Sequence, residues 1–134
     1  MAETIKMRGR LLLFDVIDDL GYKIPKDCEL TYPEKVPVCY MFSYCDPEKV
    51  WGSAIISKDE AGLICETDIT IPLDLDTFRD EYNNELPIGG YYKNQKSHYE
   101  DSIRVFDVLN LVGIGITWAP ASKEYKMVLV EESK

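Results

Sequence analysis

Apolar positions are densest in one stretch, residues 102–120, which reads SIRVFDVLNLVGIGITWAP. Its β-branched residues and glycines disfavour a helix, and its apolar positions are too crowded for a simple alternation. The stretch therefore predicts two adjoining central strands, with Asn110 near their junction. Gly113 and Gly115 predict a bulge or a close approach of another backbone.

Shorter runs of alternating or continuous apolar residues predict further strands along the chain. The segment KDEAG, residues 58–62, ends in glycine and predicts a hairpin turn between two of them. The expected strands cover residues 5–14, 36–42, 51–57, 63–71 and 124–131, and another begins at Leu86.

Residues 72–84 have the pattern of a helix, because Leu75, Phe78 and Tyr82 fall on one face. The polar segment KNQKSHYED, residues 93–101, predicts a loop.

About seven strands and one clear helix, with no internal repeat or linker, predict a single domain over residues 1–134. The class is α+β and mainly β. We expect a compact antiparallel or mixed β-barrel of about seven strands, with one or two flanking helices.

The charge narrows the range of partners. A net charge of −9 argues against non-specific nucleic-acid binding, which needs a basic surface, and leaves a basic protein partner open. No apolar run approaches the roughly 20 residues of a membrane span. The opening residues MAETIKMRGRLLLF hold too short an apolar stretch for a signal peptide. We therefore expect neither a nucleic acid nor a membrane as a partner.

The residues that hold metals are few and badly spaced. No CxxC pair occurs and the chain has one histidine, so we expect reduced thiols, no zinc site and no cofactor. The acidic group Asp15, Asp18 and Asp19 lacks calcium-loop spacing and predicts a solvated turn. The cysteines are Cys28, Cys39, Cys45 and Cys65.

Candidate catalytic groups are also sparse. His98 lies in the polar segment beside Ser97 and Ser102, but neighbours on an extended segment do not form a triad, so a surface histidine is expected. Acidic residues are plentiful, but the sequence does not define the separations that glycoside hydrolysis would need. An aromatic group could stack a ligand, although such groups more often belong to a core or a protein-binding surface. It comprises Tyr91, Tyr92 and Tyr99, with Trp51 and Trp118.

Three segments, in this order and spacing, resemble the prohead (head-maturation) serine proteases of tailed bacteriophages, whose fold is similar to that of herpesvirus assembly proteases. The first is MRGRLLLFDVIDDLGYKIP, and the second is VPVCYMFSYCDPEKVWGSAIISKDEAGLICETDI. The third combines LPIGGYY with IRVFDVLNLVGIGITWAPAS after a polar insertion. Together they span roughly residues 7–122. The resemblance implies a prohead-protease-like barrel.

The chain departs from this family at all three triad positions. Phe42 and Ser43 stand where the family carries its histidine, Pro87 where it carries its serine, and Gly113 where it carries its acid. The resemblance therefore implies a non-catalytic relative. Phe42 is expected to fill the former groove, near Pro87 and Gly113.

The expected function is that of a phage structural protein: a capsid decoration, assembly or minor head component. We expect it in the virion head, assembled in the host cytoplasm, with capsid or other phage head proteins as partners. Tyr91, Tyr92 and Tyr99 are expected contact anchors, and self-association into a homo-oligomer is compatible with this role.

Two alternatives remain open. One is an active prohead serine peptidase with a rearranged site, in which Ser43, Ser97 or Ser102 works with His98. The other is a small acidic phage inhibitor or binding module.

Overall fold

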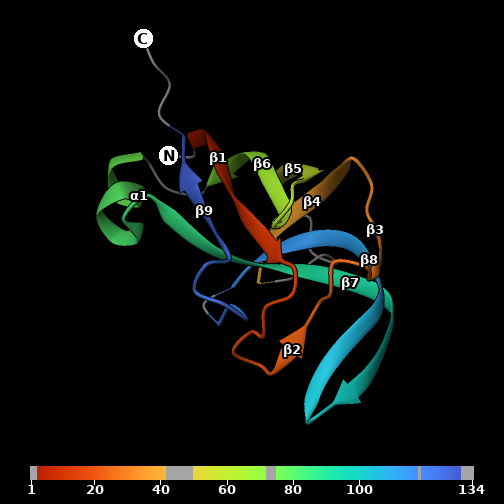
Figure 1. Cartoon of the computed structure of the whole chain (residues 1–134). Coiled ribbons are helices and arrows are strands. Elements are labelled where there is room, and N and C mark those ends of the chain that lie inside the picture. The colour runs from red at the N-terminus through yellow and green to blue at the C-terminus, as the bar shows by residue number, and fades with distance from the viewer. Residues whose placement is uncertain (1–2, 42–49, 72–74, 118, 131–134) are drawn as a thin grey trace.

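The structure, a computed structural model, describes residues 3–41, 50–71, 75–117 and 119–130. Within these ranges the chain forms nine strands and one short helix (Figure 1). The elements are β1 (Glu3–Leu13), β2 (Tyr22–Lys23), β3 (Glu29–Thr31), β4 (Lys35–Tyr40), β5 (Val50–Lys58), β6 (Gly62–Ile71), α1 (Leu75–Tyr82), β7 (Glu85–Glu100), β8 (Ile103–Ile116) and β9 (Lys126–Leu129).

Seven of the strands close into a barrel. Their order is β8-β4-β5-β6-β1-β9-β7, and β7 pairs again with β8 to complete the ring. The barrel is mixed because β4 runs parallel to β8, whereas the other neighbours in the ring are antiparallel. The predicted mainly β barrel of about seven strands is therefore confirmed, with α1 beside it.

β8 is the strand on which the other elements converge. It is one strand of 14 residues, so the prediction of two adjoining strands is wrong. β7 covers one edge, and β2, β3 and β4 follow one another along the other, which provides a nearly continuous ladder. Asn110 lies inside this ladder, where its Oδ1 accepts a hydrogen bond of 3.1 Å from Thr31 Oγ1. The predicted bulge is present beside Gly113, where the register with β7 shifts between Tyr91 and Tyr92.

The polar segment 93–101 is not a loop. β7 continues through it to Glu100 and pairs with β8, forming a long hairpin that extends from the barrel (Figure 1). Asp101 and Ser102 make the turn, with positive φ values of 49° and 70°. Two positive φ values suit the twist of a two-residue hairpin. The ladder supplies the hydrogen bonds, so polar side chains can remain in solvent.

The β5–β6 hairpin and the helix were predicted correctly. Asp59 Oδ1 accepts hydrogen bonds from the amides of Ala61 and Gly62 in the hairpin turn. Arg10 also holds Asp59 through two hydrogen bonds of 2.8 Å and lowers the pKa of its carboxyl. The helix ends at Tyr82, two residues earlier than predicted, because Asn83 and Asn84 adopt positive φ values.

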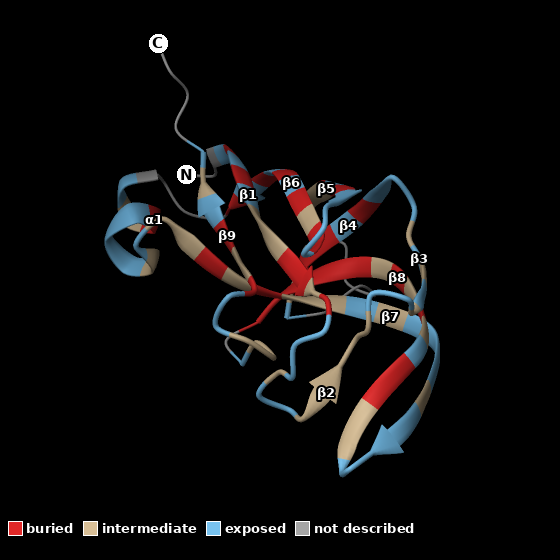
Figure 2. Cartoon of the chain, viewed as in Figure 1, coloured by how far each residue is buried: buried red, intermediate tan, exposed pale blue. Residues whose placement is uncertain are grey.

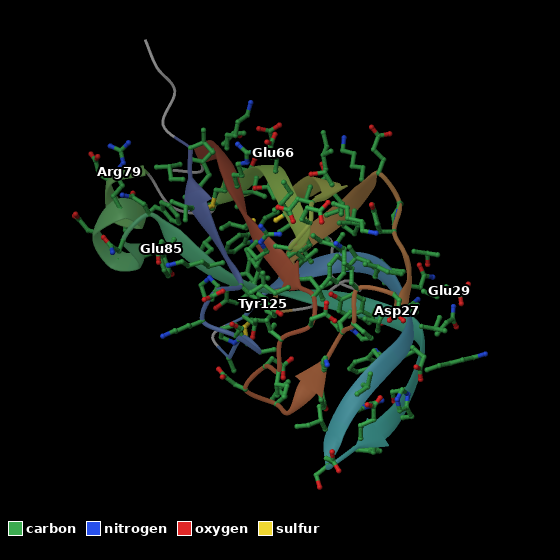
Figure 3. The ribbon with its side chains drawn as sticks, in the orientation of Figure 1. Asp27, Glu29, Glu66, Arg79, Glu85 and Tyr125 are labelled. Atoms are coloured by element: carbon green, nitrogen blue, oxygen red, sulfur yellow. The ribbon has the colours of Figure 1, made fainter. Side chains whose placement is uncertain are left out.

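Alternation along the strands builds the core (Figure 2). Met7 of β1 is buried between the exposed Lys6 and Arg8, as the pattern of polar positions predicts. α1 adds Phe78, which is 1% exposed and joins the barrel core. Charged side chains such as Glu66 and Arg79 point away from the barrel (Figure 3). The interior therefore depends on apolar packing.

Glycine is required where β9 approaches β1. A Cβ added to Gly9 would lie 1.9 Å from the carbonyl oxygen of Lys126. Gly9 pairs with Met127, and β9 in turn pairs with β7. This close approach therefore permits the seam that closes the ring.

Candidate functional site

Two of the degenerate triad positions, Pro87 on β7 and Gly113 on β8, lie on neighbouring strands. On one side of the end of β8, the amide of Met41 donates a 2.8 Å hydrogen bond to the carbonyl oxygen of Ile116. On the other side, the amide of Thr117 donates a 3.0 Å hydrogen bond to the carbonyl oxygen of Pro87. Phe42 and Ser43 lie outside the described residues.

Gly113 lies within β8, before its end at Ile116. It pairs with Tyr91, whereas Pro87 lies level with Thr117, so the two positions are offset by four residues along the strands. At the rise of an extended strand this is about 13 Å. Gly113 and Pro87 are therefore on adjacent strands but are not opposite one another, and neither offers a nucleophile or an acid.

His98 is engaged by carboxylates. Its Nδ1 lies 2.7 Å from Asp107 Oδ2, and its Nε2 contacts Glu100 Oε2. The hydrogen bonds with Asp107 and then Glu100 raise the pKa of His98. Ser97 bonds elsewhere, because its Oγ accepts a 2.9 Å hydrogen bond from Arg104 Nε. The geometry therefore does not bring His98 together with Ser97.

The three tyrosines proposed as anchors do not form one surface. Tyr99 is 72% exposed and Tyr91 is 37% exposed. Tyr92 instead turns towards a pocket, and burial raises the pKa of its hydroxyl. Trp51 stacks on Tyr40, with 5.2 Å between the ring centroids. Trp118 lies outside the described residues.

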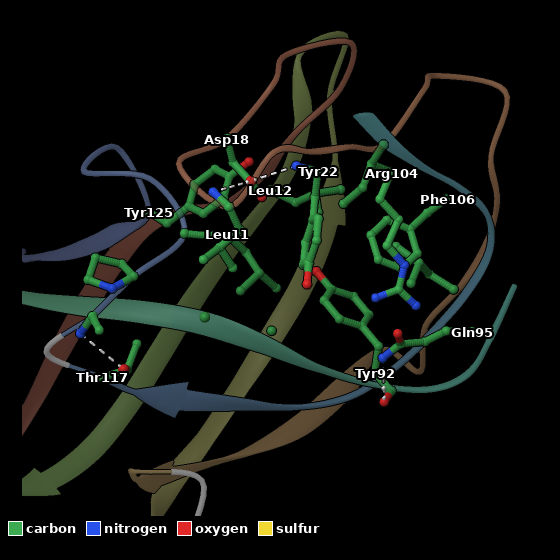
Figure 4. Close-up of a pocket in the computed structure, with 18 residues that line it drawn as sticks. Leu11, Leu12, Asp18, Tyr22, Tyr92, Gln95, Arg104, Phe106, Thr117 and Tyr125 are labelled. Carbon is green, nitrogen blue, oxygen red and sulfur yellow. Dashed lines mark hydrogen bonds between the residues drawn. The ribbon is translucent and has the colours of Figure 1, made fainter. Parts of the chain in front are cut away.

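The pocket that receives Tyr92 has a volume of about 390 Å³ (Figure 4). It lies between the β7–β8 hairpin and two connecting segments, residues 14–24 and 117–125. Gly89 and Gly90 contribute backbone to its lining, and Leu11 and Leu12 contribute apolar side chains. A Cβ added to Gly90 would lie 2.5 Å from Tyr92 Oη. Glycine at this position therefore lets the Tyr92 ring fold back along its own strand.

Arg104 is the cation that lines this pocket. Its guanidinium carbon lies 5.4 Å from the Tyr22 ring centroid and 4.8 Å from that of Phe106. The two rings meet edge to face at 5.5 Å. Across the described part of the chain, Arg104 makes no ion pair. A fixed guanidinium without a carboxylate partner is suited to bind an anion.

Two other polar groups in the lining are already used. Asp18 Oδ1 accepts hydrogen bonds from the amides of Leu20 and Tyr22, at 2.9 and 3.0 Å, so the predicted turn is present and self-bonded. The hydroxyl of Tyr125 accepts a 3.2 Å hydrogen bond from the amide of Leu13. These bonds hold the connecting segments in place around the pocket.

The sequence did not reveal this pocket, because its parts come from separate segments. The usable signal was the alternation that places Arg104 and Phe106 on one face of a strand. Residues 93–101 are polar and predict a loop. The sequence therefore does not predict the hydrogen bond between Ser97 and Arg104, which depends on a strand in this segment.

Among the residues that the structure describes, no group of three or more His, Cys, Asp or Glu side chains is arranged so that it could hold a metal ion. Cys28 and Cys65 are free thiols, and burial raises the pKa of Cys65 to about 12. In the same described ranges, no helix has the length and apolar character to cross a membrane.

The fold and the pocket together define a closed seven-stranded mixed β-barrel with a side pocket that contains arginine. Comparison with family models, curated proteins and solved structures gives no match.

Proposed function

We propose that this chain is a non-catalytic structural protein of a tailed-bacteriophage head, built on a prohead-protease-like barrel. It acts as a decoration, assembly or minor head component and binds capsid or other head proteins. The observation that supports the proposal is the closed mixed barrel, in which β7 with Pro87 pairs with β8 with Gly113. Pro87 and Gly113 there cannot serve as nucleophile and acid.

The surface supports a binding role. The net charge of −9 favours a partner with a basic patch. Complementary charges on two proteins raise the rate at which they associate. Ile17 and Leu20 are 58% and 62% exposed on the connection before β2, and Tyr99 is exposed on the hairpin. Exposed apolar and aromatic side chains are typical of contact surfaces.

Copurification with phage heads tests the proposal. A tagged chain is expressed during infection by the phage that encodes it, and proheads and mature heads are separated on a density gradient. We expect the chain in at least one head fraction. The double variant Ile17→Ser, Leu20→Ser is expected to reduce its recovery about tenfold or more, because hot-spot residues carry much of the binding energy.

Ile55→Ser is the matched control, since Ile55 is 54% exposed on the wall strand β5 and lies outside this surface. It should leave recovery unchanged. Absence of the unmodified chain from every head fraction would contradict the proposal.

A further inference from the structure

The guanidinium of Arg104 lies in the lining of the pocket. The chain has 24 acidic residues against 15 lysines and arginines, so carboxylates are abundant. Arg8 and Arg10 each face one, Glu66 and Asp59 respectively. Among the described residues Arg104 faces none, although it lines a pocket.

Arg104 is held in place before any ligand arrives. Ser97 Oγ accepts a hydrogen bond from Arg104 Nε, and the rings of Tyr22 and Phe106 lie against the guanidinium. Contacts of a cation with two aromatic faces limit its freedom. The Nε–H is used by Ser97, which leaves the two terminal nitrogens as donors. Their fork matches the two oxygens of a carboxylate.

A second donor lines the same pocket as Arg104. The Tyr92 side chain lines the same pocket (Figure 4). In the described part of the chain, its hydroxyl has no hydrogen-bond partner. Burial raises the pKa of Tyr92, so the hydroxyl keeps its proton and can donate. A half-buried donor without a partner gains a hydrogen bond when an acceptor enters.

The rest of the lining is mostly apolar. Leu11, Leu12, Ile24 and Leu109 line the pocket with the backbone of Gly89 and Gly90. A volume of about 390 Å³ lies within the range of small-ligand sites. Asp18 lies on the other side of Tyr22 from Arg104 (Figure 4), so the negative end of a ligand is favoured at Arg104 only.

We propose that this pocket binds an apolar group that ends in a single carboxylate. The carboxylate lies on the Arg104 guanidinium and accepts from the Tyr92 hydroxyl, and the apolar body lies over Gly89 and Gly90 against Leu11 and Leu12. The same chemistry occurs in a free carboxylic acid and in the C-terminal residue of a polypeptide. This proposal does not depend on the proposed role in a phage head.

Amide chemical shifts of the 15N-labelled full chain test the site. The probes are 3-phenylpropanoate and its neutral analogue 3-phenylpropanamide. Shifts at Gly89, Gly90, Tyr92 and Arg104 are expected to saturate with the acid, and the amide is expected to bind at least tenfold more weakly. Equal affinity for acid and amide, absence of binding by every probe, or shifts confined to other residues would overturn the proposal.

The peptide GGSGF with a free or amidated C-terminus distinguishes the two sources. Tighter binding of the free peptide than of 3-phenylpropanoate assigns the site to a polypeptide C-terminus, with the neighbouring Ile17 and Leu20 as added contacts. Tighter binding of the small acid assigns it to a free ligand, and comparable affinities assign it to the shared chemistry. Each of these outcomes supports the carboxylate site.

Single substitutions test whether the charge of Arg104 and the hydroxyl of Tyr92 each contribute to binding. Arg104→Gln is expected to abolish measurable binding. Arg8→Gln, which removes the same charge from the wall strand β1, should leave binding unchanged. Tyr92→Phe should weaken binding about tenfold or more, since hydrogen bonds to charged groups are strong, whereas Tyr99→Phe should have no effect.

Arg104→Lys keeps the charge but loses the planar fork, so its affinity should fall between those of the unmodified chain and Arg104→Gln. If Arg104→Gln unfolds, the comparison of Tyr92→Phe with Tyr99→Phe still decides the matter. Equal acid affinity in those two variants would contradict the proposed donor.

Discussion

The one histidine of the chain lies on an exposed hairpin, between the carboxylates of Glu100 and Asp107. The sequence correctly predicted a surface histidine. It did not predict these partners, because Asp107 belongs to the opposite strand and becomes a neighbour only through the β7–β8 register. His98, which the sequence offers as a candidate catalytic base, therefore forms hydrogen bonds within and between the two strands of the hairpin.

The contacts of His98 predict a raised pKa for its imidazole. The hydrogen bonds with Asp107 and Glu100 raise its pKa above the ordinary 6.5. Protonated His98 therefore stabilises the hairpin fully below about pH 6.5, and this contribution is lost as the pH rises through the folded-state pKa. One ring signal in an NMR titration reports the pKa directly, and Asp107→Asn should lower it. A pKa at or below 6.5 in the unmodified chain would contradict the geometry.

Among the elements, predictions succeeded where apolar and polar residues alternate and failed where they do not. β1 and β6 alternate clearly, and their positions follow from the sequence. The distal half of β7 is polar on both faces, so only its pairing with β8 defines it. β2 and β3 have two and three residues, too short to leave a pattern.

The close approach of β9 to β1 predicts that a side chain at Gly9 destabilises the barrel. Gly9→Ala would place a methyl group 1.9 Å from the backbone oxygen of Lys126, and backbone cannot move aside as a flexible side chain can. We expect a loss of at least about 2–3 kcal/mol in the free energy of unfolding, measured with urea.

Gly21→Ala is the control for this change, since no atom lies within 4 Å of its added Cβ and its φ is +78°. Strain alone should cost it about 1 kcal/mol. Equal losses in the two variants would show that the close approach of β9 does not control stability.

For the whole molecule, the barrel was predictable because many short strands, a helix and no repeat leave few ways to bury an apolar interior. The pocket was not predictable, because Tyr22, Tyr92 and Arg104 are brought together only by closure and by the hairpin that the polar segment concealed. The positions of Phe42 and Ser43, outside the described residues, stay predictions.

We propose that this barrel binds a partner or a ligand and does no covalent chemistry. Incubation of the purified full chain with a serine-reactive fluorophosphonate, followed by intact-mass measurement, tests it most directly. We predict no adduct, because His98 is engaged by two carboxylates and Ser97 by Arg104. A stoichiometric adduct that disappears in one of Ser43→Ala, Ser97→Ala or Ser102→Ala would contradict the claim and establish an active serine peptidase site.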